Sequence, residues 1–289
     1  MQKFIGTGVA LVTPFKEDLS VDFIALKKLV NYNIDNGTNY LVINGTTGES
    51  GTITDEEKQE IIAVIVAENK GRLPLVLGVG GNNTANVVKE LQTRDFSNID
   101  GILSVAPYYS KPTQEGFYQH FKAISEATEK PIILYNVPGR TASNISEETT
   151  LRLANDFENI VAVKEASGDM DQIMKIIKNK PSDFVVLSGD DGLTLPMIKM
   201  GAEGVISVIG QSHPKEFSEM VKEERSGNSE KANKLHYSLY DFYGPLYAEG
   251  NPAGIKATLK LLRVCGDTLR PPLVNVSEKI VSQLKKLLK

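Results

Sequence analysis

The chain has 289 residues, of which 41% are hydrophobic and 24% are charged. That length suits one large α/β barrel, and that composition excludes an intrinsically disordered protein. With 32 Lys and Arg residues against 36 Asp and Glu residues, the net charge of −4 offers no basic surface for nucleic acid or for an anionic membrane.

Cys265 is the only cysteine, so we expect no intrachain disulfide and a reducing compartment. The first residues lack the pattern of a signal peptide. The longest apolar run, residues 61–67, is too short to cross a bilayer. We therefore expect a soluble protein of the cytoplasm.

Eight short apolar segments rich in β-branched residues recur along the chain and predict eight strands. Their hydrophobicity is almost unbroken, which is typical of strands covered on both faces of a parallel sheet. The segments are residues 9–12, 40–43, 75–77, 102–105, 132–135, 160–163, 184–187 and 204–207. Amphipathic segments separate them, so we predict a (β/α)8 TIM barrel, with an open doubly wound sheet as the alternative.

Helical spacing and capping residues mark the segments between the strands. Four apolar residues fall on one face of the first predicted helix, namely Phe23, Leu26, Leu29 and Val30. Thr54 precedes the second helix, and Glu57 stands at the position that completes a capping box.

We divide the chain into a catalytic barrel, residues 1–226, and a C-terminal helical region, residues 227–289, in which no further strand pattern occurs. The last helix has a lysine-rich face opposite an apolar stripe, which consists of Ile280, Val281, Leu284, Leu287 and Leu288. Such a helix can bind a membrane surface, but the stripe is short, and we expect it to pack on the rest of the protein.

The sharpest functional signal is Lys164, which follows the wholly apolar residues 160–163. In a TIM barrel the active site lies at the carboxyl ends of the strands. Apolar surroundings penalise the ammonium form and so favour a free amine that can act as a nucleophile. The alternative is a lysine that reaches the rim of the barrel with its charge in water.

Tyr135 ends the fifth predicted strand, and Arg140 follows it in a Pro-Gly turn. A tyrosine hydroxyl there can transfer protons, although a core aromatic residue would give the same pattern. A guanidinium group in the loop suits a substrate carboxylate, although a solvated loop charge is the alternative.

Hydroxyl side chains also follow the second and fourth strands. Thr46 and Thr47 stand between two glycines that let the backbone approach a ligand, and the loop amides can bind a carboxylate. Tyr108 and Tyr109 follow the fourth strand. Taken alone, each of these patterns is weakly specific.

Other kinds of site are not indicated. No Walker loop or dinucleotide fingerprint occurs, and the three histidines show no metal-ligand spacing. Asp190 and Asp191 could bind a divalent cation, but no third carboxylate is near, and we interpret them as helix-capping residues.

Three motifs in chain order resemble those of the N-acetylneuraminate lyase superfamily of Schiff-base class I aldolases. They are Gly-Thr-Thr-Gly-Glu at 45–49, Tyr-Asn-Val-Pro-Gly-Arg-Thr at 135–141 and Lys-Glu-Ala-Ser-Gly-Asp at 164–169. Within it the chain most resembles the dihydrodipicolinate synthase branch, because residue 46 is threonine and Arg140 is present. The resemblance spans the chain and extends to residues 187–191, 204–208, 251–252 and 267–270.

The resemblance implies a reaction of pyruvate with aspartate-semialdehyde. Lys164 would form an imine with pyruvate, and Tyr135 would transfer protons, linked through Thr46 to Tyr109. Thr46 and Thr47 would hold the pyruvate carboxylate.

The resemblance further implies that Arg140 binds the carboxylate of the aldehyde, and that Gly189 and Ile206 line the pocket. No metal or organic cofactor is expected, because the covalent imine supplies the electron sink. In relatives the residue at position 109 reaches a neighbouring subunit, which implies at least a dimer and favours a tetramer built as a dimer of dimers.

A possible regulatory pocket includes Ser50, Asn82 and Tyr108, which match the lysine-binding residues of inhibited relatives. Lys58 and Asn86 stand where those relatives have a histidine and a glutamate. A cation and a neutral amide bind the lysine ammonium group less well than a carboxylate does. We therefore expect weak or absent inhibition by lysine.

Two rival functions are open. The first is a related pyruvate aldolase or lyase for a keto-deoxy sugar acid such as N-acetylneuraminate, from which Arg140 distinguishes the chain. The second is a barrel that has lost catalysis and only binds a ligand or partner. Against it, the chain retains Lys164, Tyr135, Thr46 and Tyr109 together.

Overall fold

A computed structural model describes residues 2–288. Its eight strands form a closed barrel in chain order, as the sequence predicts. The strands are β1 (Gly6–Ala10), β2 (Tyr40–Ile43), β3 (Leu75–Gly78), β4 (Gly101–Val105), β5 (Ile132–Asn136), β6 (Ile160–Glu165), β7 (Val185–Ser188) and β8 (Gly204–Ser207). Neighbours such as β4 and β5 pair in parallel. The open-sheet alternative is therefore wrong.

The first strand begins three residues earlier than predicted. Gly6 and Gly8 interrupt the apolar pattern, but Gly8 is needed because a β-carbon there would lie 2.1 Å from the ring of Tyr40. Leu11 and Val12, which were predicted to lie in the strand, are buried just beyond it. The backbone amide of Val12 donates to Oε1 of the Gln211 side chain at 2.9 Å.

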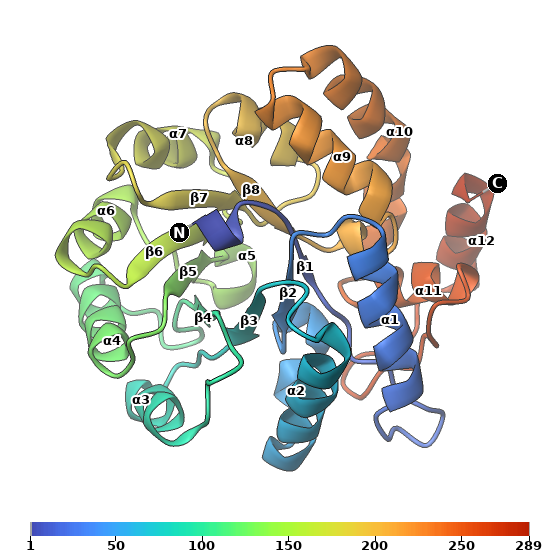
Figure 1. The fold of residues 1–289 in the computed structure, drawn as a ribbon, viewed down its shortest axis with the longest axis horizontal. Helices are drawn as coiled ribbons and strands as arrows, with labels where there is room; N and C mark the ends of the chain where they lie inside the picture. Colours follow the sequence, from blue (N-terminus) through green and yellow to red (C-terminus); the bar gives the residue numbers. More distant parts are fainter. Residues whose placement is uncertain (1, 289) are drawn as a thin grey trace. The chain divides into compact units, whose positions relative to one another are not determined.

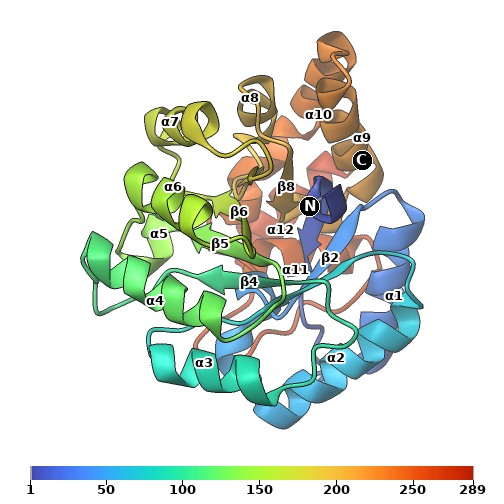
Figure 2. The same cartoon turned by 60° about the vertical axis from the view of Figure 1, so that its left-hand side comes forward.

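The chain forms two compact units, and the first contains the residues up to Gly6 and Leu75–Ile206. Its helices are α3 (Thr84–Thr93), α4 (Gln114–Glu126), α5 (Pro138–Thr141), α6 (Glu147–Asp156), α7 (Met170–Asn179) and α8 (Thr194–Lys199), after the short 3-10 helix η1 (Gln2–Phe4). The pairs α3 and α4, α4 and α6, and α6 and α7 are neighbours, and these four helices cover the outer side of β4 to β7 (Figure 1 and Figure 2).

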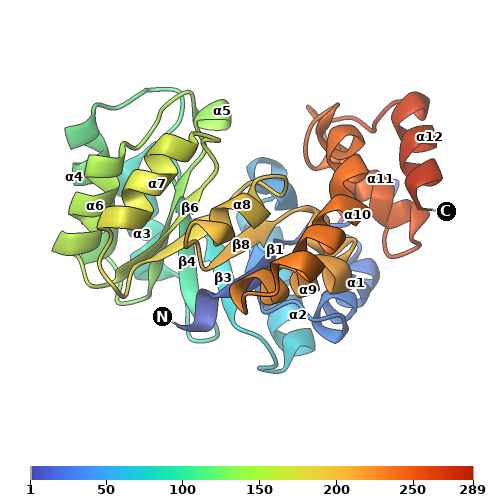
Figure 3. The same ribbon diagram turned by 90° about the horizontal axis from the view of Figure 1, so that it is seen from above.

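The second unit contains Thr7–Pro74 and the residues from Ser207 onward. Its helices are α1 (Phe23–Asp35), α2 (Asp55–Asn69), α9 (Pro214–Arg225), α10 (Ser229–Tyr247), α11 (Ala253–Leu261) and α12 (Glu278–Leu287), with the 3-10 helices η2 (Thr46–Gly48), η3 (Ser50–Thr52) and η4 (Ile209–Gln211). Helices α10, α11 and α12 pack on one another (Figure 3).

Several local predictions are confirmed in these helices. Leu26, Leu29 and Val30 of α1 are buried, and Phe23 at the start of the helix is partly buried. Thr54 caps α2, with Glu57 completing the capping box. Ile280 and Leu284 of α12 are buried as expected for a packed helix, and the rest of the stripe, Val281, Leu287 and Leu288, is partly buried. Within residues 2–288, no helix is both long and apolar enough to cross a membrane.

Helices fill the region after residue 227 as predicted, in α10, α11 and α12. The division of the chain into two functional domains at that point stays a prediction.

Candidate active site

Lys164 and Tyr135 lie side by side on neighbouring strands. The register of β5 and β6 pairs Tyr135 with Lys164 and Asn136 with Glu165. The Nζ atom of Lys164 lies 4.1 Å from the centroid of the Tyr135 ring. Each residue is only 6% exposed. The structure thus places the Lys164 side chain beside the Tyr135 ring and out of bulk water, so that a nucleophile and a proton-transfer group stand next to each other.

Gly189 leaves the space in which the Lys164 side chain lies. It follows β7, and its backbone amide donates to the carbonyl oxygen of Glu165 at 2.7 Å. A β-carbon at Gly189 would lie 3.0 Å from Cε of Lys164 and 2.6 Å from Cβ of Ala166. The absence of a side chain at this position therefore lets β6 and the turn after β7 approach closely around the lysine. Ile206, also predicted at the site, is buried in β8.

Glu165 lies on the opposite face of β6 from Lys164, because successive side chains of a strand alternate. Its carboxylate accepts hydrogen bonds from Ser167 Oγ at 2.6 Å, from Gln172 Nε2 of α7 at 3.3 Å and from the amide of Asn136. Burial raises the pKa of Glu165, and these hydrogen bonds oppose the rise. The network ties the end of β5 to the end of β6 and fixes the strands that carry Tyr135 and Lys164.

Arg140 and Tyr109 lie in exposed segments of the same unit. Arg140 is exposed on α5, the short helix that begins two residues after β5 ends. Tyr109 is 88% exposed and has a left-handed backbone, with φ 72°. Its backbone amide faces the carbonyl oxygen of Thr141 at 3.4 Å. A tyrosine rarely combines so exposed a ring with a left-handed backbone.

Thr46 and Thr47 are the first two residues of the 3-10 helix η2, which Asn44 and Gly45 connect to β2. Thr47 is 3% exposed, and its hydroxyl accepts a hydrogen bond from Asn251 Nδ2 at 2.9 Å. The hydroxyl of Thr13 donates to the carbonyl oxygen of Gly48 at 2.7 Å. The turn is thus held by residues far away in the sequence, and its role in binding pyruvate stays a prediction.

The residues of the predicted regulatory pocket fall in both units. In the first unit, Asn82 Nδ2 donates to the carbonyl oxygen of Tyr108 at 3.3 Å, and Asn86 lies in the first turn of α3. In the second unit, Ser50 is exposed in η3 and Lys58 is partly buried in α2. The pocket stays a prediction.

The prediction that Asp190 and Asp191 cap a helix is wrong, because the N-cap of α8 is Leu193, without a side-chain cap hydrogen bond. Asp190 Oδ1 instead accepts from the amides of Gly192 at 2.9 Å and Leu193 at 3.2 Å, in the turn before the helix. Among residues 2–288, no group of three or more His, Cys, Asp or Glu side chains could hold a metal ion.

Sequence reasoning missed a buried ion pair between Lys256 of α11 and Glu49. Both side chains are fully buried, and Lys256 Nζ also donates to the carbonyl oxygen of Thr268 at 2.8 Å. Burial lowers the pKa of Lys256, and the Glu49 carboxylate opposes that change. The signal was present in the sequence, because Lys256 lies within the mostly apolar residues 253–259, much as Lys164 follows the apolar residues 160–163.

Comparison with known proteins gives full-length matches. A model of the Dihydrodipicolinate synthetase family matches residues 3–289. The 4-hydroxy-tetrahydrodipicolinate synthase of Flavobacterium psychrophilum is 58% identical over 284 residues, which cover 98% of this chain and 97% of that protein. The enzyme of the same name from Parabacteroides distasonis is 54% identical over 286 residues, which cover 98% and 96%.

A solved structure gives the same result for the fold. The crystal structure of dihydrodipicolinate synthase from Aquifex aeolicus matches with a TM-score of 0.95 and 42% identity, covering 99% of this chain and 97% of that one.

Proposed function

The chain belongs to the dihydrodipicolinate synthetase family, and we infer that it catalyses the reaction of its relatives, the synthesis of 4-hydroxy-tetrahydrodipicolinate in the diaminopimelate route to lysine. The chain is thus a lyase of the TIM-barrel class. The observation that supports the chemistry best is the buried amine of Lys164, which lies 4.1 Å from the centroid of the Tyr135 ring.

We propose that the Lys164 amine attacks the keto carbon of pyruvate. The carbonyl oxygen leaves as water, and an imine joins Nζ to the pyruvate carbon. Tyr135 carries the protons that this step moves, because its hydroxyl belongs to the residue paired with Lys164 across the two strands. The imine nitrogen then accepts electrons when the methyl group loses a proton, which yields an enamine.

The second half of the reaction joins the two substrates. The enamine carbon attacks the aldehyde carbon of L-aspartate-4-semialdehyde, and the aldehyde oxygen becomes the 4-hydroxyl group. Arg140 binds the carboxylate of this substrate through paired N–H donors. The substrate amine then attacks the imine carbon, which closes the ring and releases Lys164 as a free amine.

The remaining roles follow from the resemblance of these sequence motifs to those of the family. Thr46 and Thr47 hold the pyruvate carboxylate through hydroxyl and amide donors, and Gly189 and Ile206 line the pocket. Thr46 also links Tyr135 to Tyr109 in proton transfer. Holding both substrates in one site raises their effective concentration. This effect can lower the free-energy barrier by up to about 7–11 kcal/mol relative to the reaction in solution.

We further propose that Tyr109 acts in the active site of a neighbouring copy, so that activity requires at least a dimer. The proposed complete assembly is a tetramer built as a dimer of dimers. The 88% exposure of the Tyr109 ring in the single chain supports this role. The proposed location of the protein is the cytoplasm, together with the other enzymes of lysine biosynthesis. Light scattering of the purified protein tests the assembly, and a monomer that turns over at full rate would contradict it.

A coupled assay with pyruvate and aspartate-semialdehyde tests the function. We expect turnover by the wild-type protein and none by Lys164→Ala, with circular dichroism showing that the variant is folded. If the wild-type protein consumes pyruvate only with N-acetylmannosamine, the chain is the sugar-acid aldolase of the first rival. If it consumes pyruvate with neither aldehyde, it is the non-catalytic barrel of the second rival.

A further inference from the structure

The residue that follows η2 has a backbone that its side-chain type rarely adopts. Glu49 connects η2 to η3 with φ 57° and ψ 38°, in the left-handed region. A residue with a β-carbon is disfavoured there, and it persists only where its surroundings hold it. Glu49 is 4% exposed, so buried contacts must stabilise its left-handed backbone conformation.

Those contacts come from the C-terminal part of the same unit. Glu49 Oε1 pairs with Nζ of Lys256, and Oε2 accepts from the backbone amide of Arg270 at 3.1 Å. The Nζ atom of Lys256 lies 4.2 Å from the centroid of the Phe15 ring, which closes the cation off from water. Both carboxylate oxygens of Glu49 are therefore occupied.

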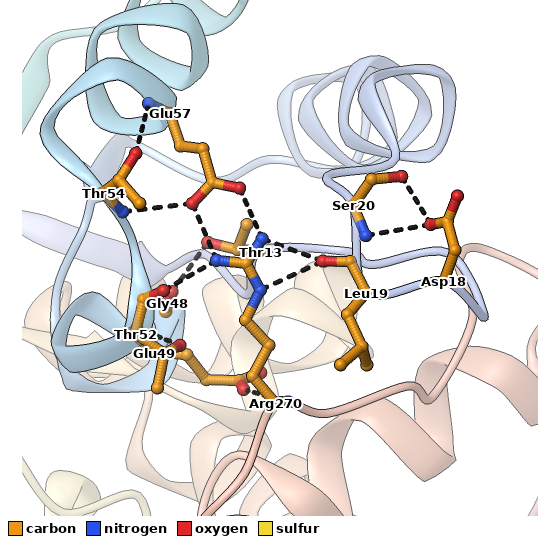
Figure 4. Close-up of polar contacts among 10 residues, drawn as sticks. All are labelled: Thr13, Asp18, Leu19, Ser20, Gly48, Glu49, Thr52, Thr54, Glu57 and Arg270. Carbon is orange, nitrogen blue, oxygen red and sulfur yellow. Dashed lines mark hydrogen bonds and ion pairs between the residues drawn. The ribbon is translucent and has the colours of Figure 1, made fainter.

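Arg270 in turn is fixed by its own side chain, as Figure 4 shows. Its guanidinium forms a two-point ion pair with Glu57 of α2 and donates to the carbonyl oxygen of Thr52 at 2.7 Å and to that of Leu19 at 2.8 Å. The segment that reaches Glu49 is thus anchored on the helix that follows η3. Such planar, paired contacts hold a backbone more rigidly than a single bond does.

A buried ion pair is a weak source of net stability, because desolvation offsets the attraction between the charges. Removal of one partner nevertheless leaves an unpaired buried charge, which must move toward water or force its neighbours apart. In this chain the residue that would move is joined to Thr46, Thr47 and Gly48 by three peptide bonds. Loss of the ion pair should therefore displace the η2 turn more than it disturbs the hydrophobic core.

On the premise that Thr46 and Thr47 bind the pyruvate carboxylate as proposed above, we propose that the Glu49–Lys256 ion pair is a positioning device for the η2 turn. Glu49 and Lys256 do not touch substrate in this proposal. They hold the left-handed residue at the end of η2, and so they fix where the threonine hydroxyls and amides point. Loss of the pair should weaken pyruvate binding and leave the aldehyde site unaltered.

The test compares Glu49→Gln and Lys256→Met with the double variant and with a control. Lys180→Met is the matched control, because it breaks another largely buried ion pair, in which Nζ of Lys180 lies 2.7 Å from Oε1 of Glu203. We expect each single variant to raise the pyruvate KM at least tenfold and to change the aspartate-semialdehyde KM less than twofold. Lys180→Met should leave both KM values within twofold, whatever it does to Tm.

The double variant tests whether the two residues act as a unit. We expect the fold-rise in its pyruvate KM to be well below the product of the fold-rises in the two single variants, because the double variant leaves no buried charge unpaired. Single variants that remain folded with a wild-type pyruvate KM would overturn the proposal. Equal rises in both KM values would also overturn it, because they indicate a general loss of structure. Single effects that simply multiply in the double variant would overturn it too, because they show that the two residues act independently.

If Glu49→Gln does not fold, Glu49→Asp decides the matter, because it keeps the charge and shortens its reach by one methylene. A selective rise in the pyruvate KM supports the proposal, and an unchanged value refutes it. Absence of turnover with pyruvate and aspartate-semialdehyde in the wild-type protein would instead refute the proposed function itself.

Discussion

Replacement of Gly189 by alanine is a sharp steric test of the site around Lys164. The new β-carbon would lie 2.6 Å from Cβ of Ala166, 3.0 Å from Cε of Lys164 and 3.2 Å from the carbonyl oxygen of Glu165. Carbon atoms in normal contact are about 3.5–4.0 Å apart, so the overlap with Ala166 is about 1 Å. Because Ala166 Cβ is fixed to the backbone, the turn and the lysine must both move.

The size of the effect follows from that displacement. Overpacking of this kind costs about 1–3 kcal/mol of folding free energy. A reacting group misplaced by about 1 Å loses about a hundredfold in rate. We therefore expect Gly189→Ala to lower kcat/KM about a hundredfold while Tm falls by only a few degrees.

The assay that isolates the lysine is the rate at which pyruvate becomes trapped by borohydride, since this step needs no aldehyde. Gly244→Ala on α10 is the control, because nothing lies within 4 Å of its new β-carbon. Alanine in place of glycine within a helix should raise stability by up to about 1 kcal/mol without altering the kinetics. A wild-type trapping rate in Gly189→Ala would refute the close packing of Gly189 against Lys164.

Three further outcomes are expected. Arg140→Ala should raise the aspartate-semialdehyde KM about 10- to 100-fold, because a charge-assisted contact is worth about 1.5–3 kcal/mol, and should leave pyruvate trapping unchanged; a change in trapping alone would contradict the assigned role. Burial lowers the pKa of His120 from 6.5 to about 4, so its contribution to stability is present above pH 6.5 and is lost as the pH falls toward 4, by up to about 3 kcal/mol. Urea denaturation between pH 4 and 7.5 should show a shallower acid loss for His120→Gln, and parallel profiles would rule that cause out. Finally, sub-millimolar lysine should not inhibit the enzyme, because Lys58 and Asn86 offer no carboxylate to its ammonium group, and clear inhibition in a dose–response assay would overturn that expectation.

Local patterns predicted most of the barrel. Residues 40–43 and 204–207 form β2 and β8 with the predicted bounds. For β2 the cause is local, because Asn44 and Gly45 end the apolar run after Ile43. The start of β1 was missed because Gly8, which the pattern treats as a break, is the residue that the ring of Tyr40 requires. A contact between two strands decided that position, and no local pattern contains such a contact.

The candidate site divides in the same way. Lys164 and Tyr135 were found from the carboxyl ends of their strands, and the register that pairs them follows from the parallel barrel. Lys256 gave the same signal within a helix and was overlooked, because its partner Glu49 lies 207 residues away. Glu57 was predicted as a capping residue, and its second role as the partner of Arg270 depends on the fold.

Trapping of the pyruvate imine is the direct test of Lys164 as the nucleophile. The protein is incubated with pyruvate, and borohydride reduces the imine. The intact mass is then measured by mass spectrometry, and the protein is digested for peptide mapping. We predict one reduced pyruvate adduct per chain, on Lys164. An intact mass without an adduct, or an adduct on the other deeply buried lysine, Lys256, would contradict the mechanism.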